Sequence, residues 1–390
     1  MDLDRIRVET PGTERVIHLN NCGSALMPQP VLDAVIGHLS LEAEIGGYEA
    51  EITAAAELNN TYQAISRLIN CQVDELAIVE NATVAWDMAF YGLPLVRGDV
   101  VLTTVSEYAS NYIAYLQRAE RDGIEVRVAP NDETGQIDVT ALENMIDSNV
   151  KLISITHVPT NGGLINPAVD IGNVARRAGI PYLLDACQSV GQLHLDVDVI
   201  GCDMLSATGR KFLRGPRGTG FLYVRDTILD YLQPPFLDLH SARWKTSRSY
   251  EIVSNARRFE NWENYVAGKI GLGVAVDYAL GIGLSNIAQR IKDLATNLRD
   301  CMADLPGVMV HDLGEKKSGI ISFSVSNVEP QKVIEIMSSD GINISSTSVL
   351  STRCDMELRG IQEMNRIGIH YYNSEDELDQ FMDCLRSILD

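Results

Sequence analysis

Short, continuously apolar runs alternate with helical stretches between residues 76 and 224, and this alternation limits the possible folds. Runs of this kind are typical of strands that are buried on both faces of a parallel sheet. Helical patterns separate several of them, at residues 84–93, 112–122 and 169–178. The sequence therefore predicts an α/β fold with a large, doubly wound, mostly parallel sheet, which binds ligands at the carboxyl ends of its strands. The predicted strands are Leu76–Val79, Val100–Val105, Val126–Ala129, Leu152–Thr156, Tyr182–Leu184 and Phe221–Val224.

The pattern changes after about residue 285. Ile321, Phe323 and Val325 alternate with serines, which predicts a strand with one buried and one wet face. Near the end, the Ser374–Glu377 segment has the form of a capping box that opens an amphipathic helix. We expect a large α/β domain over residues 15–284 and a smaller α+β domain over residues 285–390. The N-terminal arm, residues 1–14, is expected to belong to the smaller domain.

Charge and cysteine content exclude several classes of protein. The net charge of −21 argues against a nucleic-acid-binding protein, which needs a basic face. The seven cysteines are scattered and form neither a disulfide framework nor a metal motif, so a reducing cytoplasm is expected. The N-terminus carries charge where a signal peptide would be apolar, and the most apolar window, residues 268–284, is too short to span a bilayer.

Two candidate anion sites lie far apart in the chain. Glu80-Asn81-Ala82-Thr83 follows a predicted strand and opens a helix, so its free N–H groups and the Thr83 hydroxyl can bind an anion. An ordinary N-cap gives the same pattern. In the second domain, Arg366 can pair with a substrate carboxylate through two hydrogen bonds, or form a surface salt bridge.

Asp185 ends a buried strand in Tyr182-Leu-Leu-Asp185-Ala-Cys-Gln188. A buried carboxylate is costly unless it meets a cation or hydrogen-bond donors. A protonated pyridine nitrogen is such a cation, and ionised Asp185 would keep the ring an electron sink. A metal ligand or a purely structural acid are the alternatives.

Ser206–Pro216 combines small hydroxyl residues, glycine and cations in what we expect to be a turn between two strands. Thr208 and Arg210 can reach a phosphate, and Lys211 can form an imine if its pKa is lowered by neighbouring cations. A basic surface turn is the alternative. The run Arg217-Gly-Thr-Gly220 leads into a strand rather than a helix, so it does not fit a dinucleotide fingerprint.

With these residues in this order, nearly the whole chain resembles the class V aminotransferase family of fold-type I pyridoxal-phosphate enzymes. That family includes cysteine desulfurases, selenocysteine lyases, isopenicillin N epimerase and ergothioneine-pathway C–S lyases. The resemblance implies pyridoxal 5'-phosphate as cofactor and a homodimer with the active site at the subunit interface. It also implies residue roles: Lys211 forms the aldimine, Asp185 pairs with the pyridine nitrogen, Gln188 and Asn161 address the phenolic oxygen, Ala82, Thr83, Thr208 and Arg210 bind the phosphate, and Arg366 binds the substrate carboxylate.

Three positions depart from the desulfurase pattern. Where desulfurases have a histidine that stacks on the cofactor, Glu107 is followed by Tyr108, which can stack but is a poorer acid–base group. The region of the desulfurase loop cysteine, Ser345–Ser351, contains no cysteine, and Cys354 is expected to be a packed residue. Glu263 stands where a small hydroxyl residue contacts the phosphate across the dimer.

The resemblance therefore implies an enzyme that acts on an amino acid through an external aldimine and a Cα carbanion, with Lys211, Tyr108 and Asp185 as catalytic residues. We expect β- or γ-elimination, as in a C–S lyase acting on a cysteine-derived or similarly substituted amino acid. An epimerase or aminotransferase is the main alternative, and a non-catalytic family member is a further one. Asn21, Ser24 and Tyr48 are candidate substrate contacts, although Tyr48 also fits a packed aromatic.

Overall fold

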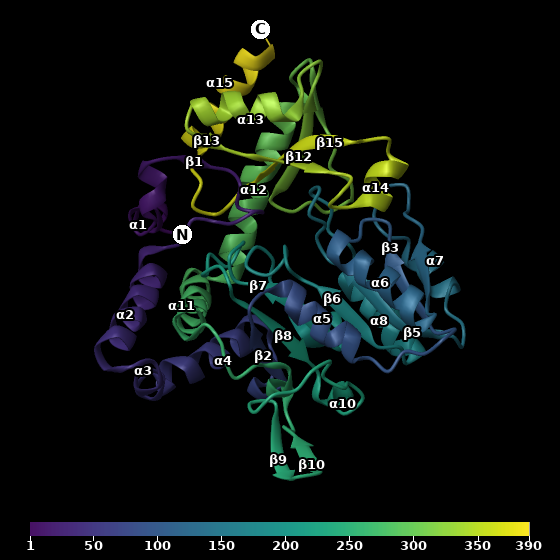
Figure 1. The fold of residues 1–390 in the computed structure, drawn as a ribbon. Helices are drawn as coiled ribbons and strands as arrows, with labels where there is room; N and C mark the ends of the chain where they lie inside the picture. Colours follow the sequence, from purple (N-terminus) through teal and green to yellow (C-terminus); the bar gives the residue numbers. More distant parts are fainter. Residues whose placement is uncertain (390) are drawn as a thin grey trace.

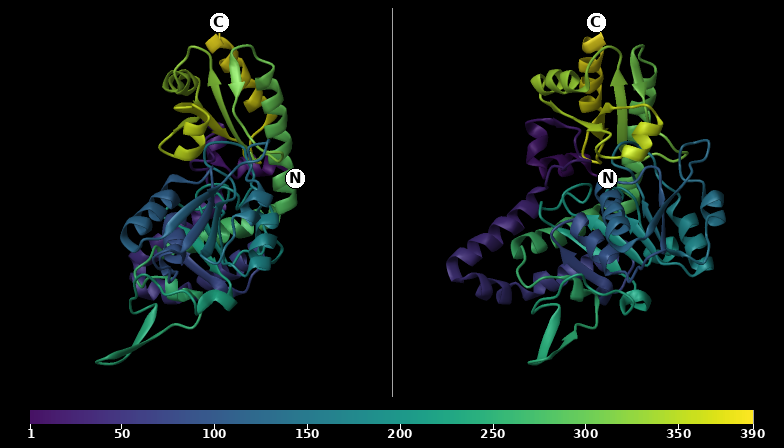
Figure 2. Two further views of the ribbon diagram at one scale, coloured as in Figure 1. Left: turned by 90° about the vertical axis from the view of Figure 1, so that its right-hand side faces the viewer. Right: turned by 45° about the vertical axis from the view of Figure 1, so that its right-hand side comes forward.

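The computed structural model describes residues 1–389 and contains a large α/β layer with a smaller sheet domain above it (Figures 1 and 2). The large sheet has seven strands in the order β2-β8-β7-β6-β5-β3-β4. All are parallel except β8, which is antiparallel to both of its neighbours. The strands are β2 (Leu76–Val79), β3 (Val100–Thr104), β4 (Glu125–Ala129), β5 (Val150–Thr156), β6 (Tyr182–Asp185), β7 (Met204–Thr208) and β8 (Gly220–Val224).

Alternate strand residues feed two separate cores, one on each face of this sheet. Val101, Leu183 and Leu222 pack with Trp86 and Phe90 under the helices of one face. The intervening side chains pack on the opposite face, against α4, α8 and α11. Successive side chains of a strand point to opposite faces, so a strand covered by helices on both sides is mostly apolar along its whole length.

The helices of the large layer follow the strands in the predicted alternation. Near the start of this layer, Gly46 separates two of the helices. The helices of the layer are α2 (Gln29–Ile45), α3 (Gly47–Thr53), α4 (Ala55–Ile69), α5 (Ala82–Gly92), α6 (Ala109–Asp122), α7 (Val139–Asn144), α8 (Ala168–Ala178), α9 (Val197–Ile200), α10 (Asp226–Leu229) and α11 (Val266–Ile282).

The smaller sheet is antiparallel, with strand order β11-β12-β15-β14, and it buries its apolar face against α12, α13 and α15. The predicted capping box is confirmed, because the side chains of Ser374 and Glu377 bond each other's backbone N–H groups at the start of α15. The elements are α12 (Leu284–Ala303), β11 (Val308–Val310), β12 (Ile320–Val325), α13 (Pro330–Ser339), β13 (Ile342–Asn343), β14 (Ser345–Ser348), α14 (Arg353–Leu358), β15 (Glu363–Gly368) and α15 (Glu375–Leu389).

The serine face of β12 is drier than the sequence predicts. Ser322 is fully buried and donates a hydrogen bond to Asp312 (2.9 Å), next to Gly162 of the large layer. The prediction of a wet face is wrong at this position, because a polar side chain tolerates burial when it has a partner.

The two layers meet where α11 ends and α12 begins, with a bend of 78° at Gly283. Within residues 1–389, no single helix is both long and apolar enough to cross a membrane. The N-terminal segment, with α1 (Leu3–Val8) and β1 (Ile17–His18), lies beside the smaller domain, and β1 pairs with β13. We keep the bend as the proposed domain boundary.

Two strand features were not predicted. Ser206–Thr208, expected to be part of a turn, form the end of β7 and are buried, and β6 and β8 pair with the backbone of this strand on its two sides. The hairpin of β9 (Ala242–Thr246) and β10 (Ser249–Ile252) projects from the lower end of the molecule (Figure 1).

Candidate active site

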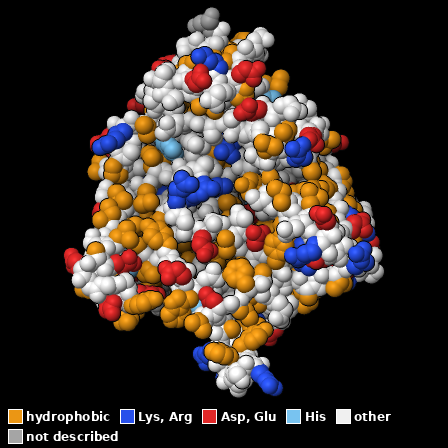
Figure 3. Space-filling model, viewed as in Figure 1, with side chains coloured by type: hydrophobic (Ala, Val, Ile, Leu, Met, Phe, Trp, Pro, Cys, Tyr) orange, Lys and Arg blue, Asp and Glu red, His pale blue; other side chains and the backbone are white. Residues whose placement is uncertain are grey.

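A pocket of about 470 Å³ opens at the carboxyl ends of β5, β6 and β7, beside the first turn of α5. Figure 3 shows this face of the molecule hollowed, with Lys and Arg side chains gathered at the edge of the hollow. The position confirms the expectation for a doubly wound sheet, in which loops at the carboxyl ends of the strands form the binding crevice.

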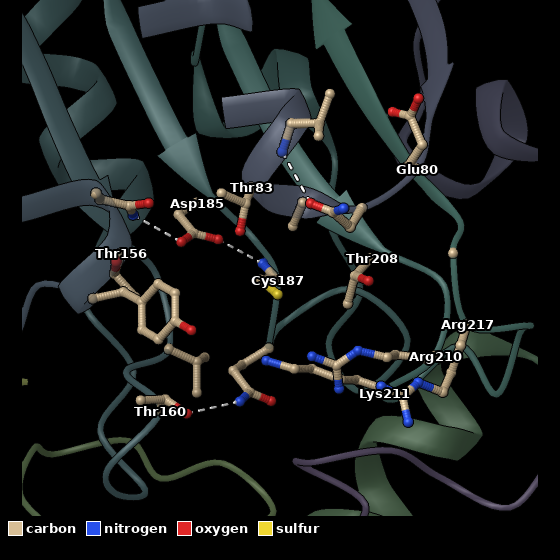
Figure 4. Close-up of a pocket in the computed structure, with 18 residues that line it drawn as sticks. Glu80, Thr83, Thr156, Thr160, Asp185, Cys187, Thr208, Arg210, Lys211 and Arg217 are labelled. Atoms are coloured by element: carbon tan, nitrogen blue, oxygen red, sulfur yellow. Dashed lines mark hydrogen bonds between the residues drawn. The ribbon is translucent and has the colours of Figure 1, made fainter. Parts of the chain in front are cut away.

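Asp185 forms one wall of the pocket, at the end of β6, and is 5% exposed. Its Oδ2 accepts from Asn111 Nδ2 (2.9 Å), and its Oδ1 accepts from the Cys187 backbone N–H (2.9 Å; Figure 4). Burial raises the pKa of Asp185, while these donors and the nearby charge of Lys211 act in the opposite direction. Asp185 is thus a desolvated carboxylate that would gain from a cation in the pocket.

Cations form the opposite wall. Arg210, Lys211 and Arg217 all line the pocket (Figure 4), and within residues 1–389 none of them pairs with a carboxylate. Arg210 donates to the Gly23 carbonyl, while Lys211 is 8% exposed. In a chain with a net charge of −21, three such cations make a local site for an anion.

The first turn of α5 adds N–H groups to this wall. Asn81 is the N-cap, because its side chain accepts from the Val84 N–H (3.0 Å). The capping function is therefore met by Asn81, and the Thr83 hydroxyl stays available. Ala82, Thr83 and Thr208, the residues expected to bind a phosphate, all line the pocket.

Thr160 joins two of the predicted site residues. Its hydroxyl accepts from Gln188 Nε2 (3.3 Å) and from Arg366 Nη1 (2.7 Å). Arg366 also donates to Ser345 and has no carboxylate partner within residues 1–389, so the salt-bridge alternative does not describe it. Arg366 itself does not line the pocket, and the Thr160 hydroxyl separates its guanidinium from Gln188, which does.

Four predicted site residues lie elsewhere in the subunit. Asn161 donates to Asp355 (2.7 Å) and does not line the pocket. Asn21 is fully buried and bonds the Gly368 carbonyl and the Tyr372 hydroxyl, which makes it a joint between segments. Ser24 donates to the Arg210 carbonyl (3.4 Å), and Tyr48 is exposed on α3 beside Trp262 in a separate hollow.

Tyr108 lines the pocket as predicted, but the residues around it were partly missed. Asn111 was not predicted; it lies in the first turn of α6, whereas Glu107 precedes that helix. Thr160 and Cys187 also line the pocket, and only their closeness to predicted residues in the sequence signalled them. Cys187 has a raised pKa because its thiol is buried, and nearby Lys211 lowers it.

The fold and pocket together define the class of protein. Seven mixed strands with an antiparallel β8, an antiparallel C-terminal sheet and a pocket at the strand ends form the fold-type I architecture of pyridoxal-phosphate enzymes. Residues 17–381 match the family model described as aminotransferase class-V, and the chain belongs to that family.

Relatives within the family are desulfurase-like. A probable cysteine desulfurase of Methanothermobacter thermautotrophicus is 28% identical, over 100% of this chain and 98% of that protein. The apo structure of a cysteine desulfurase from Thermococcus onnurineus is 25% identical, with a TM-score of 0.92, and covers 99% of this chain and 98% of that one. The cystine C–S lyase C-DES, solved with its product cysteine persulfide, shares the fold at 23% identity and a TM-score of 0.87, covering 96% and 98%. Another C-DES structure holds glycine covalently linked to its PLP cofactor.

Proposed function

We propose that this protein is a pyridoxal-phosphate enzyme in which Lys211 attaches the cofactor. The observation that carries the proposal is the polarity of the pocket, with Arg210, Lys211 and Arg217 beside a helix start on one side and buried Asp185 on the other. A phosphate fits the first wall and a protonated pyridine nitrogen fits the second.

The residues present also pass a test of fit. One end of the Gln188 amide, its Oε1 atom, is buried and has no hydrogen-bond partner among residues 1–389. Buried polar groups are nearly always paired, so this atom indicates a missing hydrogen-bonding group. Thr83 and Thr208 add hydroxyls, and Tyr108 adds an aromatic ring, to the lining of the same pocket. This lining suits a flat aromatic ring with an anionic substituent.

When bound, pyridoxal phosphate supplies an electron sink for negative charge at the substrate α-carbon. Asp185 would hold a proton on the ring nitrogen, because a buried carboxylate gains most from a charge-assisted bond. Lys211 would remove the substrate α-proton at Nζ. Thr83, Thr208 and Arg210 hold the phosphate, and Arg366 takes the substrate carboxylate with its geometry set by Thr160.

For the reaction, we propose elimination from a cysteine-derived or similarly substituted amino acid. The names of the relatives, cysteine desulfurase and cystine C–S lyase, support C–S bond cleavage. The segment 345–353 has no cysteine to take up sulfur, and Cys354 lies outside the pocket on α14. Sulfur would therefore leave as a small product. Epimerisation and transamination are the alternative outcomes of the same α-proton removal.

A second copy of the chain is the proposed partner. The outer surfaces of α2 and α3 expose large apolar side chains, more than an isolated subunit gains from. They are Leu32, Ile36, Leu39, Ile45, Tyr48 and Ile52. Figure 3 shows hydrophobic side chains among acidic ones over this part of the molecule. A dimer through this face would cover Tyr48 and Trp262, which lie together in one hollow. The seven cysteines are free thiols, and a reducing compartment stays the proposed location.

The test of the reaction is a product assay of the purified holoenzyme with cysteine conjugates, cystine and plain amino acids. We expect release of a keto acid together with a sulfur product, without conversion of the cofactor to its amine form. Keto-acid formation with that conversion would identify an aminotransferase. Deuterium uptake at the α-carbon with neither product would identify an epimerase.

A further inference from the structure

Glu107 is a second carboxylate in the interior of the site, behind Asp185. It is 3% exposed and has no cationic partner within residues 1–389. Four neutral donors surround it instead. They are the hydroxyls of Thr103 (2.9 Å) and Thr156, the Asn111 amide (2.9 Å) and the Tyr108 N–H (2.9 Å).

One amide nitrogen joins the two carboxylates. Asn111 Nδ2 donates to Glu107 Oε1 and to Asp185 Oδ2, at 2.9 Å in each case. The two acids are thus held one amide apart, with Asp185 in the lining of the pocket and Glu107 behind it. A carboxylate on the surface forms its hydrogen bonds with water at no such cost. Burial of Glu107 near the like charge of Asp185, by contrast, costs free energy.

We infer that Glu107 is a positioning residue for the cofactor: through Asn111 it fixes the Asp185 carboxylate and adds a second negative charge that favours the protonated ring nitrogen. This inference rests on the proposed function, since the cation that it serves is the pyridine nitrogen. The cost of burying Glu107 is then offset when a cation enters the pocket, because opposite charges interact strongly where water is excluded.

The remaining charged groups near this pair are consistent with that role. Lys211 lies close enough to Asp185 to lower its pKa, and Arg210 lies on the same wall as Lys211. Tyr115 is the other titratable group beside Glu107, and burial holds its pKa well above the ordinary value, so it stays neutral. Burial raises the pKa of Glu107 to about 6, so the second charge is present at neutral and alkaline pH.

The test compares two ligands that lack the aldehyde and bind the apoprotein reversibly. One is 4-deoxypyridoxine 5'-phosphate, and the other is its analogue with a ring CH in place of the nitrogen. The dissociation constant of the CH analogue divided by that of the nitrogen ligand reports how strongly the site favours the protonated nitrogen. At mildly alkaline pH, we expect Glu107→Gln to reduce this ratio about tenfold, the equivalent of one pKa unit at the ring nitrogen.

Glu107→Asp is the matched control, because it keeps the charge, and it should retain most of the preference for nitrogen. Thr103→Val removes a donor that stabilises the ionised Glu107 and should reduce the preference less than Glu107→Gln, which keeps the test available if that variant does not fold. A purely structural role predicts that Glu107→Gln weakens both ligands equally, and an unchanged ratio would overturn the inference. If the wild-type protein bound neither ligand, the proposed cofactor itself would be rejected instead.

Discussion

At the scale of single residues, the site combines buried carboxylates with a group of cations. Asp185 and Glu107 are buried carboxylates that share the Asn111 amide, while Arg210, Lys211 and Arg217 line the pocket without carboxylate partners in residues 1–389. The buried carboxylates are unfavourable by themselves, because unpaired charge in a poorly solvated place costs free energy. A ligand that carries both an anion and a cation satisfies both walls together.

Asp185→Asn should weaken cofactor binding about 30-fold. The substitution keeps the size of the side chain but removes a charge-assisted hydrogen bond worth about 2 kcal/mol. Equilibrium titration of the apoprotein measures the effect. Asp170→Asn, at an exposed position on α8, is the matched control and should bind as the wild type does. Equal affinities of the wild type and Asp185→Asn would remove Asp185 from the site.

Glu107 should make the stability of the apoprotein depend on pH. Burial raises its pKa from 4.5 to about 6, so the protonated acid is favoured in the folded state. The stabilisation of the folded state by protonated Glu107 is fully present at pH values below the unfolded pKa and is lost as the pH rises through about 6. The free energy of unfolding of the wild type, relative to Glu107→Gln, should therefore fall by about 2 kcal/mol over this range. Denaturant titrations at a series of pH values measure it, and parallel curves for the two proteins would contradict the pKa shift.

At the scale of elements, the sequence predicted well where burial was continuous. The predicted strand Leu76–Val79 coincides with β2, and the predicted strand 182–184 differs from β6 only by the omission of Asp185. Both predictions succeeded because the strands consist of apolar and aromatic side chains up to Asp185. The run at 204–208 was missed, since Ser206 and Thr208 are polar although both are buried in β7. Contacts such as Thr160 with Arg366 join residues far apart in the chain and have no local signal.

Helix α8 packs against α9 through Gly172, and this contact should tolerate no side chain. A Cβ at this position would lie 1.8 Å from the carbonyl oxygen of Ile200. Gly172→Ala should therefore lower the free energy of unfolding by about 3 kcal/mol, as expected for overpacking against rigid backbone. Gly37→Ala is the control, since nothing lies within 4 Å of its Cβ on exposed α2, and it should be neutral or stabilise by about 0.5–1 kcal/mol. Similar denaturation midpoints for Gly172→Ala and the wild type would show that α9 moves aside.

At the scale of the whole molecule, the large domain lines the pocket and the smaller domain contacts that lining through Arg366, and one subunit does not bring all the residues expected at the site into the pocket. Arg366 approaches from β15 of the smaller domain, whereas Lys211 follows β7 of the large sheet. Tyr48 and Trp262 line a hollow of their own, near the apolar face of α2 and α3. The predicted contact of Tyr48 with substrate would require a second subunit.

Paired substitutions on α2 should disrupt the proposed dimer. Ile36 and Leu39 are 53% and 44% exposed, and Ile36→Asp with Leu39→Asp would place two charges in the apolar face. We expect the molar mass in solution, measured by analytical ultracentrifugation, to fall from that of a dimer to that of one chain. Met309→Asp, at an exposed position on β11, is the control and should leave the mass unchanged. A wild-type protein with the mass of a single chain would contradict the proposal.

The central claim is that Lys211 carries the cofactor, and trapping that bond tests it most directly. The purified protein is loaded with pyridoxal phosphate, reduced with borohydride, digested and analysed by mass spectrometry. We expect a pyridoxyl phosphate adduct on the peptide that contains Lys211 and loss of the visible absorbance on reduction. The corresponding peptide of Lys211→Ala should carry no adduct. A protein that stays colourless with added cofactor, or an adduct at a different lysine, would contradict the attachment of the cofactor to Lys211.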